Sequence, residues 1–249
     1  MSISKEYDLQ ESEIKKTLVV IPTYNERENI AKLTEQLLEI SSDISILIVD
    51  DDSPDGTGKI ADELTSASTR IKTIHRKGKG GRGSACVEGF KYALANDFDY
   101  VFEMDADFSH NPQEIPLFFD KIKSYDMVIG SRYLKGSKIV DWTLSRRVFS
   151  KIANFYARTI LGIPISDYTN GYRIYKKKVI SDLDFEKIKS KGYIVLSEMA
   201  YQVYKKGFRI GEVPTLFVNR KRGQSNLSFQ EIFTAFTGVL KVKFRYLSS

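Results

Sequence analysis

The sequence contains few of the residues that form disulfides and zinc sites. Among its 249 residues there is one cysteine, Cys86, and there are two histidines, His75 and His110. A single cysteine excludes an internal disulfide and suits a reducing compartment. With so few sulfur and imidazole ligands, the composition also argues against a zinc site.

Long hydrophobic runs are absent as well. No apolar stretch approaches the roughly 20 residues that a helix needs to cross a bilayer. The segment 1–16 is polar and charged and has no signal-peptide character. The segment 228–249 comes nearest to a membrane segment, but Lys241, Lys243 and Arg245 interrupt it. We therefore expect no transmembrane helix, and we expect 228–249 to form an amphipathic helix that packs on the domain or lies on a membrane surface.

The remaining composition is that of an ordinary globular domain. Hydrophobic residues make up 42% of the chain and charged residues 28%, which is enough apolar material for one large core. The formal net charge is +6 and the isoelectric point is about 9.1. A basic chain of this kind favours anionic partners, such as phosphates, nucleic acid or an anionic membrane surface.

Apolar runs alternate with helical periodicity through the first half of the chain. The predicted strands lie at 17–21, 44–50, 71–75, 100–104 and 126–130, and the predicted helices at 28–40, 84–96 and 112–123. This alternation predicts an α/β fold with a mostly parallel central sheet and helices on both faces. Beyond residue 140 the less regular pattern predicts a helix at 146–161, strands at 171–176 and 209–219, and a final helix from 228.

Polar residues follow four of the predicted strands at the point where each strand ends. These clusters span 22–26, 50–56, 105–107 and 130–133. Each cluster alone is compatible with turn chemistry, because Pro, Asn, Asp, Ser and Gly all favour turns. Together they indicate a binding site, because open parallel sheets bind ligands beyond the carboxyl ends of their strands.

The acidic residues in these clusters indicate a divalent cation. Carboxylates gathered at one edge repel one another unless a cation neutralises them. Oxygen ligands suit Mg²⁺ or Mn²⁺, which keep few protein ligands and share the remaining coordination with substrate phosphates. The spacing alone also allows a carboxylate pair for general acid–base catalysis, as in glycosidases.

A basic, glycine-rich loop at 78–83 formally matches GxGxxG between a strand and a helix. A dinucleotide fold is disfavoured, because the preceding strand is half polar and no acidic residue follows at the spacing that a ribose pocket needs. Nucleic-acid binding is disfavoured too, since no aromatic stacking platform accompanies Arg76, Lys77, Lys79 and Arg82. A loop that grips a phosphate, or that moves, is the favoured interpretation.

Taken in order, the motifs resemble those of the dolichyl- or polyprenyl-phosphate mannosyltransferases, inverting family-2 glycosyltransferases of the GT-A fold. The matching strings are PTYNERENI, VDDDSPDGT, GRGSACVEGF, MDADFSHNP, GSRY, DYTNGYRIY, KGY followed by Glu198, GEVP and FVNRKRGQSNL. They imply a GT-A domain over 17–227, between a polar N-terminal segment (1–16) and a C-terminal amphipathic helix (228–249). Processive polysaccharide synthases are disfavoured, because QxxRW and spanning helices are absent.

The resemblance implies roles for residues on the donor side. The pocket for the base and ribose of the nucleotide would be formed by Pro22, Tyr24, Glu26, Val49 and Asp51. The segment Asp105, Ala106 and Asp107 would lie beside the diphosphate. The metal ligands would be Asp105, Asp107 and Ser109, with Asp107 the firmest. Ser109 stands where some relatives carry a Gln ligand, and it is a poorer ligand.

The resemblance also implies which residues bind the acceptor and carry catalysis. Arg132 and Arg220 would bind phosphates and contact the nucleotide sugar, while Arg146 and Ser150 would grip the lipid phosphate. The expected catalytic set is therefore Asp107, Arg132, Arg146, Ser150 and Arg220. The chain departs from the family pattern at Asn226, where Lys is frequent, and at Arg82, where relatives usually carry an aliphatic residue.

The implied reaction is inverting, metal-dependent transfer of mannose from GDP-mannose to dolichyl or polyprenyl phosphate, with Mg²⁺ or Mn²⁺ as cofactor. Two alternatives stay open: transfer of glucose or N-acetylglucosamine from a UDP-sugar by the same fold, and a non-catalytic nucleotide-sugar-binding module. The implied location is the cytoplasmic face of a membrane, held peripherally or through a membrane-tethering subunit, with no nucleic-acid partner. Glu198 is expected to point inward, while Asp167, Asn170 and Arg173 suit a functional or a turn-organising role equally.

Overall fold

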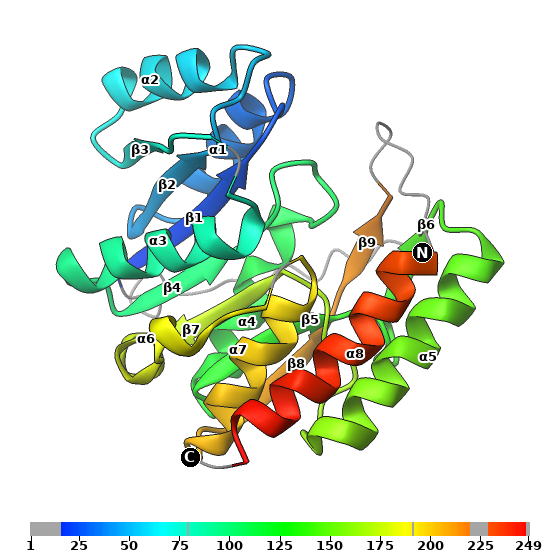
Figure 1. The fold of residues 1–249 in the computed structure, drawn as a ribbon. Coiled ribbons are helices and arrows are strands. Elements are labelled where there is room, and N and C mark those ends of the chain that lie inside the picture. Colours follow the sequence, from blue (N-terminus) through cyan, green and yellow to red (C-terminus); the bar gives the residue numbers. More distant parts are fainter. Residues whose placement is uncertain (1–15, 79, 191, 220–228, 248–249) are drawn as a thin grey trace.

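The structure is a computed structural model that describes residues 16–78, 80–190, 192–219 and 229–247 (Figure 1). Residues 1–15 of the predicted N-terminal segment therefore lie outside the described residues, as do Arg220, which was expected to bind phosphate, and Asn226. No helix of the described part is long and apolar enough to cross a membrane.

A seven-stranded sheet forms the centre of the molecule. Its order is β3-β2-β1-β4-β7-β5-β8. The strands are β1 (Thr17–Thr23), β2 (Ile44–Asp50), β3 (Ile71–His75), β4 (Tyr100–Glu103), β5 (Met127–Ser131), β7 (Arg173–Lys176) and β8 (Ile210–Pro214). Every pairing is parallel except the two made by β7, which runs antiparallel to β4 and β5. The carboxyl ends of β1, β2, β4 and β5 therefore meet at one edge of the sheet.

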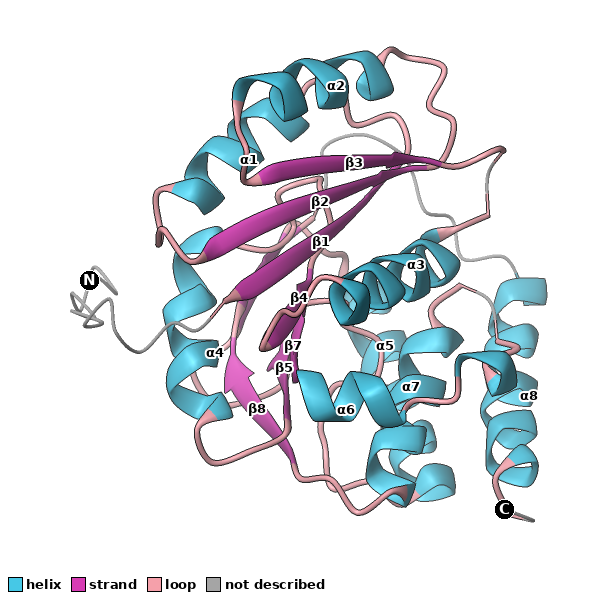
Figure 2. Ribbon diagram, turned by 90° about the vertical axis from the view of Figure 1, so that its left-hand side faces the viewer, coloured by secondary structure: helices cyan, strands magenta, loops and turns pink. Residues whose placement is uncertain are grey.

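Helices cover both faces of this sheet (Figure 2). One face packs against α1 (Ile30–Leu38), α2 (Thr57–Ala67) and α4 (Ile115–Ile122). The other face packs against α3 (Arg82–Ala95), α6 (Lys177–Asp182) and α7 (Ile194–Lys205). Near-continuous apolar strands such as β2 are buried on both sides because both faces are covered. The predicted α/β fold with a mostly parallel sheet is confirmed.

Two further helices and a small ribbon lie beside this core. Helices α5 (Leu144–Leu161) and α8 (Phe229–Arg245) run alongside each other at the right of Figure 1 and are in contact. Strands β6 (Lys138–Val140) and β9 (Leu216–Val218) pair in parallel as a separate two-stranded sheet. Short helical turns at Pro112–Glu114 and Phe185–Lys187 complete the described elements.

Helix α8 packs on the domain through its last turns. Val239, Val242 and Tyr246 are buried against α5 and α7. The fully buried Glu198 carboxylate of α7 accepts a hydrogen bond from the Arg245 guanidinium. Glu198 therefore points inward and makes a structural contact that anchors α8 on α7.

The sequence pattern missed helix α2 and the direction of β7. In α2 only Thr57 and Ala61 are buried, so the apolar periodicity that marks a helix is weak there. The apolar content of β7 reveals a buried strand but not its direction, because strands covered on both faces look alike whichever way they run.

Candidate active site

A chain of hydrogen bonds begins at the Asp-x-Asp segment after β4. The Asp105 amide donates to His110 Nδ1 (3.2 Å), so His110 Nε2 carries the proton that bonds to Asn170 Oδ1 (2.8 Å). Burial lowers the pKa of His110, which keeps the ring neutral, and the ring stacks on Tyr172 with centroids 4.7 Å apart. The histidine thereby fixes the backbone that presents Asp105.

The same chain continues to the residue after β5. The backbone amide of Asn170 donates a hydrogen bond to Asp167 Oδ1 (3.1 Å). The Asp167 carboxylate also accepts hydrogen bonds from Nε and Nη2 of Arg132 (2.7 and 2.8 Å). Burial alone raises the pKa of Asp167, but the Arg132 guanidinium outweighs it and holds the pKa below its ordinary value. Asp167 and Asn170 therefore organise the site, and Arg132 is oriented by a two-point ion pair.

Asp107 is presented by a tight local turn. Its Oδ1 accepts a hydrogen bond from the Ser109 amide (3.0 Å), and the intervening Phe108 has a positive φ of 57°. Ser109 is buried, and its carbonyl accepts from the Val218 amide of β9 (3.2 Å). The backbone of Ser109 thus fixes Asp107, which leaves the second oxygen of that carboxylate for a ligand.

Arginines neutralise part of the negative charge that we expected a metal to balance. Arg76 pairs with Asp51 (2.5 Å) and Arg82 pairs with Asp105 (2.5 Å). In the described residues, no three His, Cys, Asp or Glu side chains form a group that could hold a metal alone. The acidic donors Asp105 and Asp107 suit Mg²⁺ or Mn²⁺ only if a substrate oxygen supplies much of the coordination.

The residues expected around the nucleotide lie at the ends of β1 and β2. Pro22 and Val49 are partners in neighbouring strands, and Val49 is fully buried. Tyr24 is 37% exposed beyond β1. Asp51, after β2, accepts a hydrogen bond from the Gly81 amide of the glycine-rich loop (2.7 Å), and the Glu26 amide donates to Thr57 Oγ1 (2.9 Å).

Two other acids in the second cluster perform turn chemistry. Asp50 accepts hydrogen bonds from the Ser53 amide (3.1 Å) and Thr23 Oγ1 (3.0 Å). Asp55 accepts from the amide and hydroxyl of Thr57 at the start of α2 (2.9 and 2.6 Å). The turn interpretation is therefore correct for these two residues.

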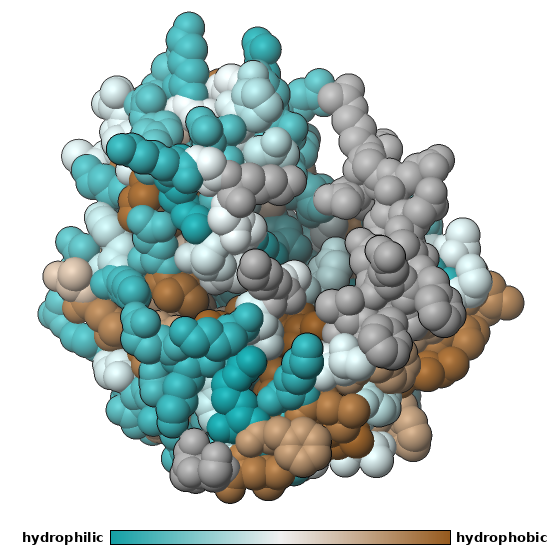
Figure 3. All heavy atoms as spheres, in the orientation of Figure 1, coloured by the Kyte–Doolittle hydropathy of each residue, from teal (hydrophilic) through white to brown (hydrophobic). Residues whose placement is uncertain are grey.

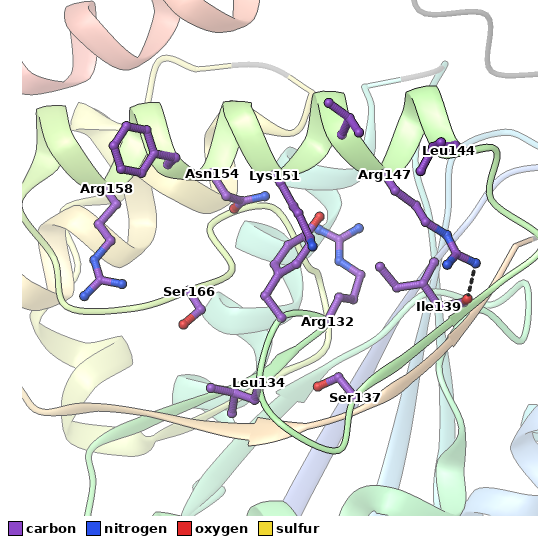
Figure 4. Close-up of a pocket in the computed structure, with 13 residues that line it drawn as sticks. Arg132, Leu134, Ser137, Ile139, Leu144, Arg147, Lys151, Asn154, Arg158 and Ser166 are labelled. Carbon is purple, nitrogen blue, oxygen red and sulfur yellow. Dashed lines mark hydrogen bonds between the residues drawn. The ribbon is translucent and has the colours of Figure 1, made fainter.

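A groove of about 650 Å³ opens between α5 and the segment after β5 (Figure 4). Figure 4 shows Arg147, Lys151 and Arg158 projecting from α5 on the groove side, with Arg132 beneath the helix. Apolar side chains share the lining: Leu134, Ile139, Leu144, Val148 and Phe155. Clustered cations with an apolar wall suit a ligand that has an anionic head and a hydrocarbon body.

Trp142 lies beside two arginines, of which Arg132 lines the groove. The guanidinium carbons of Arg132 and Arg146 lie 5.2 and 4.4 Å from the centre of its ring, within cation–π range. Arg146 also donates to Asn219 Oδ1 (3.0 Å), and Ser150 accepts from the Tyr133 hydroxyl (2.5 Å). The structure thus brings Arg132, Arg146 and Ser150 to one region.

Comparison with known proteins decides the family. Residues 18–184 match the glycosyl transferase family 2. The chain belongs to glycosyl transferase family 2. It is 41% identical over 219 residues to a polyprenol monophosphomannose synthase of Mycolicibacterium smegmatis, covering 87% of this chain and 83% of the relative. It is 38% identical over 213 residues to an undecaprenyl-phosphate mannosyltransferase of Micrococcus luteus, covering 86% of this chain and 88% of the relative.

Solved structures confirm the GT-A fold of this family 2 member. Glucosyl-3-phosphoglycerate synthase from Mycobacterium tuberculosis, in complex with Mn²⁺, UDP-glucose and phosphoglyceric acid, superposes with a TM-score of 0.70. It is 15% identical and covers 94% of this chain and 82% of its own. The same enzyme with UDP gives a TM-score of 0.68 at 14% identity, covering 94% and 82%.

Sequence reasoning missed several residues of this family 2 site. The groove cations of α5 appear in the sequence at 147, 151 and 158, a spacing that places them on one helix face and so could have revealed them. His110 was noted only as a poor zinc candidate, and its neutral, positioning contact depends on Asn170, which lies 60 residues away. No local pattern reveals such a contact.

Proposed function

We propose that the chain transfers mannose from GDP-mannose to the phosphate of a polyprenyl or dolichyl lipid. Two relatives that are about 40% identical over most of the chain are named for mannose transfer to such phosphates. The observation that carries the proposal is the basic, apolar-walled groove that meets the Asp-x-Asp edge at Arg132. A lipid phosphate has the two chemistries that line this groove.

The donor end lies at the carboxyl edge of β1, β2 and β4. Pro22, Tyr24, Glu26, Val49 and Asp51 are proposed to surround the nucleoside, because they border the ends of β1 and β2. Asp107 and Asp105 would hold Mg²⁺ or Mn²⁺ together with diphosphate oxygens, while Ala106 keeps the two side chains apart along the chain. A divalent ion bound there supplies positive charge to the departing diphosphate.

The acceptor end lies under α5. Arg132 and Arg146 are proposed to hold the acceptor phosphate, with Ser150 and Arg220 as further donors. Arginines suit this task because the guanidinium fork binds phosphate oxygens in pairs and always stays charged. The ion pair with Asp167 and the Trp142 ring fix the two guanidinium groups before the substrate binds.

Bond changes in the reaction follow from the charges of the substrates. An oxygen of the lipid phosphate attacks the anomeric carbon, and the bond from that carbon to the nucleoside diphosphate breaks, with its electron pair leaving on the diphosphate. The nucleophile is already an anion at neutral pH, so no general base is needed. The side chains instead orient two anions toward each other and offset their repulsion.

An exposed apolar stripe of α5, which also contributes to the groove wall, suits contact with a membrane surface that carries the acceptor. Leu144 and Phe155 are 77% and 72% exposed, and Val148 and Ile152 extend the same helical stripe. Arg147, Lys151 and Arg158 flank this stripe. In Figure 3, hydrophobic residues gather along the lower right of the molecule, over α5 and α8. We propose that this stripe lies against the headgroup region of the membrane.

A transfer assay tests the proposed function. Purified full-length protein is incubated with radiolabelled GDP-mannose, UDP-glucose or UDP-N-acetylglucosamine and a short polyprenyl phosphate, with Mn²⁺ or with a chelator. We expect organic-phase product from GDP-mannose and only when metal is present. Product from a UDP-sugar and not from GDP-mannose would show that the donor is the UDP-sugar. Metal-dependent nucleotide binding without transfer or hydrolysis would favour a non-catalytic binding module.

Two variants separate the donor and acceptor roles in this assay. Asp107→Asn should lower kcat by at least about 100-fold, because the metal contact is worth several kcal/mol in the transition state. Arg146→Ala should mainly raise the KM for the lipid phosphate. The matched controls are Asp120→Asn, whose side chain is exposed on α4, and Arg209→Ala. Arg209 is exposed just before the amino end of β8, at the sheet edge opposite the site. Full activity of Asp107→Asn without metal would refute the assigned role.

A further inference from the structure

Arg82, the first residue of α3, reaches from the glycine-rich loop into the Asp-x-Asp site. Its Nε donates to Asp105 Oδ1 (2.5 Å), its Nη1 to Glu103 Oε2 (3.2 Å) and its Nη2 to the Gly171 carbonyl (2.8 Å). The side chain is only 21% exposed. All three ends of the guanidinium fork are therefore committed to the end of β4 and the segment before β7.

The surrounding backbone leaves space for this guanidinium. A Cβ atom at Gly171 would lie 2.1 Å from Arg82 Nη2, so a side chain at that position would collide with the bound arginine. Glu103 is fully buried and also accepts from the Tyr175 hydroxyl (2.7 Å), with Arg173 Nε at 4.0 Å. Burial lowers the pKa of Arg82, but the adjacent carboxylates, Asp105 foremost, more than reverse this, so the guanidinium stays charged.

Among the described residues, arginines offset two of the three acidic charges in this cluster. Arg82 and Arg173 offset Glu103 and Asp105, and among the described residues no ion pair involves Asp107. A divalent ion entering alone would meet Asp107, one oxygen of Asp105 and a neighbouring guanidinium cation that repels it. No third acidic, histidine or cysteine ligand of the described chain joins them.

We propose that Arg82 is a positioning residue that occupies one oxygen of Asp105 and thereby makes divalent-ion binding depend on the nucleoside diphosphate. The inference rests on the proposed function, whose metal and nucleotide share this edge. The diphosphate supplies the additional oxygen ligands and the negative charge that the metal site lacks in the nucleotide-free protein. Metal and nucleotide then tighten each other's binding by the same factor, as linkage requires.

Binding measurements on the wild-type chain give the first test. Mn²⁺ affinity is measured by the loss of the free-ion electron paramagnetic resonance signal, alone and with saturating GDP or UDP. We expect one nucleotide to tighten Mn²⁺ binding at least about tenfold, a typical size of coupling between two ligands. Equal Mn²⁺ affinity with and without nucleotide would overturn the proposal. No Mn²⁺ binding in either condition would instead overturn the metal site of the proposed function.

Four variants then assign the effect to Arg82, three that remove or displace its guanidinium and one that keeps its charge. Arg82→Met removes this guanidinium from Asp105. Arg82→Met with Glu103→Gln does so at unchanged net charge and without a buried unpaired carboxylate at position 103, and Gly171→Ala displaces Arg82 with every charge retained. Each should raise nucleotide-free Mn²⁺ affinity about tenfold, since a unit charge a few ångströms away acts with energies of that order. Arg82→Lys should restore part of the wild-type coupling, because it keeps the charge but not the fork.

Arg76→Met is the matched control. Arg76 makes an equally short ion pair, but with Asp51 on the nucleoside side. We expect this variant to change nucleotide affinity and to leave nucleotide-free Mn²⁺ affinity unchanged. Circular dichroism and Tm identify the variants that fold. Unchanged nucleotide-free Mn²⁺ affinity in folded Arg82→Met, in the folded double variant or in folded Gly171→Ala refutes the role of Arg82, while mannosyl transfer by the wild-type chain would still support the proposed function.

Discussion

Replacing Asp167 by Asn tests how strongly one buried ion pair stabilises the site. The Asp167 side chain is fully buried and binds Arg132 through two guanidinium nitrogens (2.7 and 2.8 Å). It also accepts the amides of Arg132, Thr169 and Asn170. Asn keeps the shape but loses the charge and turns an acceptor into a donor. Arg132 would then be a buried cation without its counterion.

Removing one partner of a buried pair costs about 3–5 kcal/mol of folding free energy. We expect Asp167→Asn to fall at the lower end, about 3 kcal/mol, because Asn retains one acceptor oxygen and the cavity does not change. Urea denaturation followed by circular dichroism measures the difference. The matched control is Asp97→Asn, which removes a carboxylate from an exposed ion pair with Lys177 and should leave the free energy of unfolding unchanged.

The pH dependence gives this prediction a second readout. Burial favours the neutral acid, but Arg132 outweighs burial and lowers the folded-state pKa of Asp167 below its ordinary value of 3.8. The carboxylate therefore stabilises the fold fully above about pH 4, and this stabilisation is lost as the pH falls through the lowered pKa. The gap between wild type and variant should be constant above about pH 4 and shrink below it. A gap that is small at pH 7, or that grows on acidification, would refute the reasoning.

Three further predictions concern α5, the arginine–tryptophan contact and the packing of α3. The double substitution of Phe155 and Ile152 by Ser should weaken binding to anionic vesicles at least about tenfold, as measured by co-sedimentation, because each apolar side chain contributes about 1.5–3 kcal/mol when buried. Undiminished binding would exclude this face of α5 as the membrane-contacting surface. Trp142→Leu should raise the KM for the lipid phosphate several-fold, because it removes the cation–π contacts of Trp142 with Arg132 and Arg146, while GDP affinity measured by calorimetry stays constant. Gly89→Ala should lower the free energy of unfolding by about 1–3 kcal/mol, because the new Cβ would lie 2.4 Å from a methyl group of Val20. Adding Val20→Ala in a double-mutant cycle should recover part of this loss.

The position of the site could be predicted from the sequence because each contributing motif is local. A near-continuous apolar run such as 44–50 specifies a strand buried on both faces, and the polar residues after it mark the strand's carboxyl end. Strands β1, β2, β4 and β5 run in the same direction, although the antiparallel β7 separates β4 from β5, and this brings Asp51, Asp107 and Arg132 to one edge. The GT-A fold and the glycosyltransferase family followed from that ordered set of motifs.

The charge pairing within the site was decided by the tertiary structure. The sequence shows arginines at 76, 82 and 132, but not that they neutralise Asp51, Asp105 and Asp167 respectively. Those partners are 23 to 35 residues apart and meet only when the glycine-rich loop and the segment before β7 fold over the strand ends. Side-chain pairing depends on distances of a few ångströms between distant segments. Strand and helix periodicity specify which segments form and which faces are buried, but they carry no information on those distances.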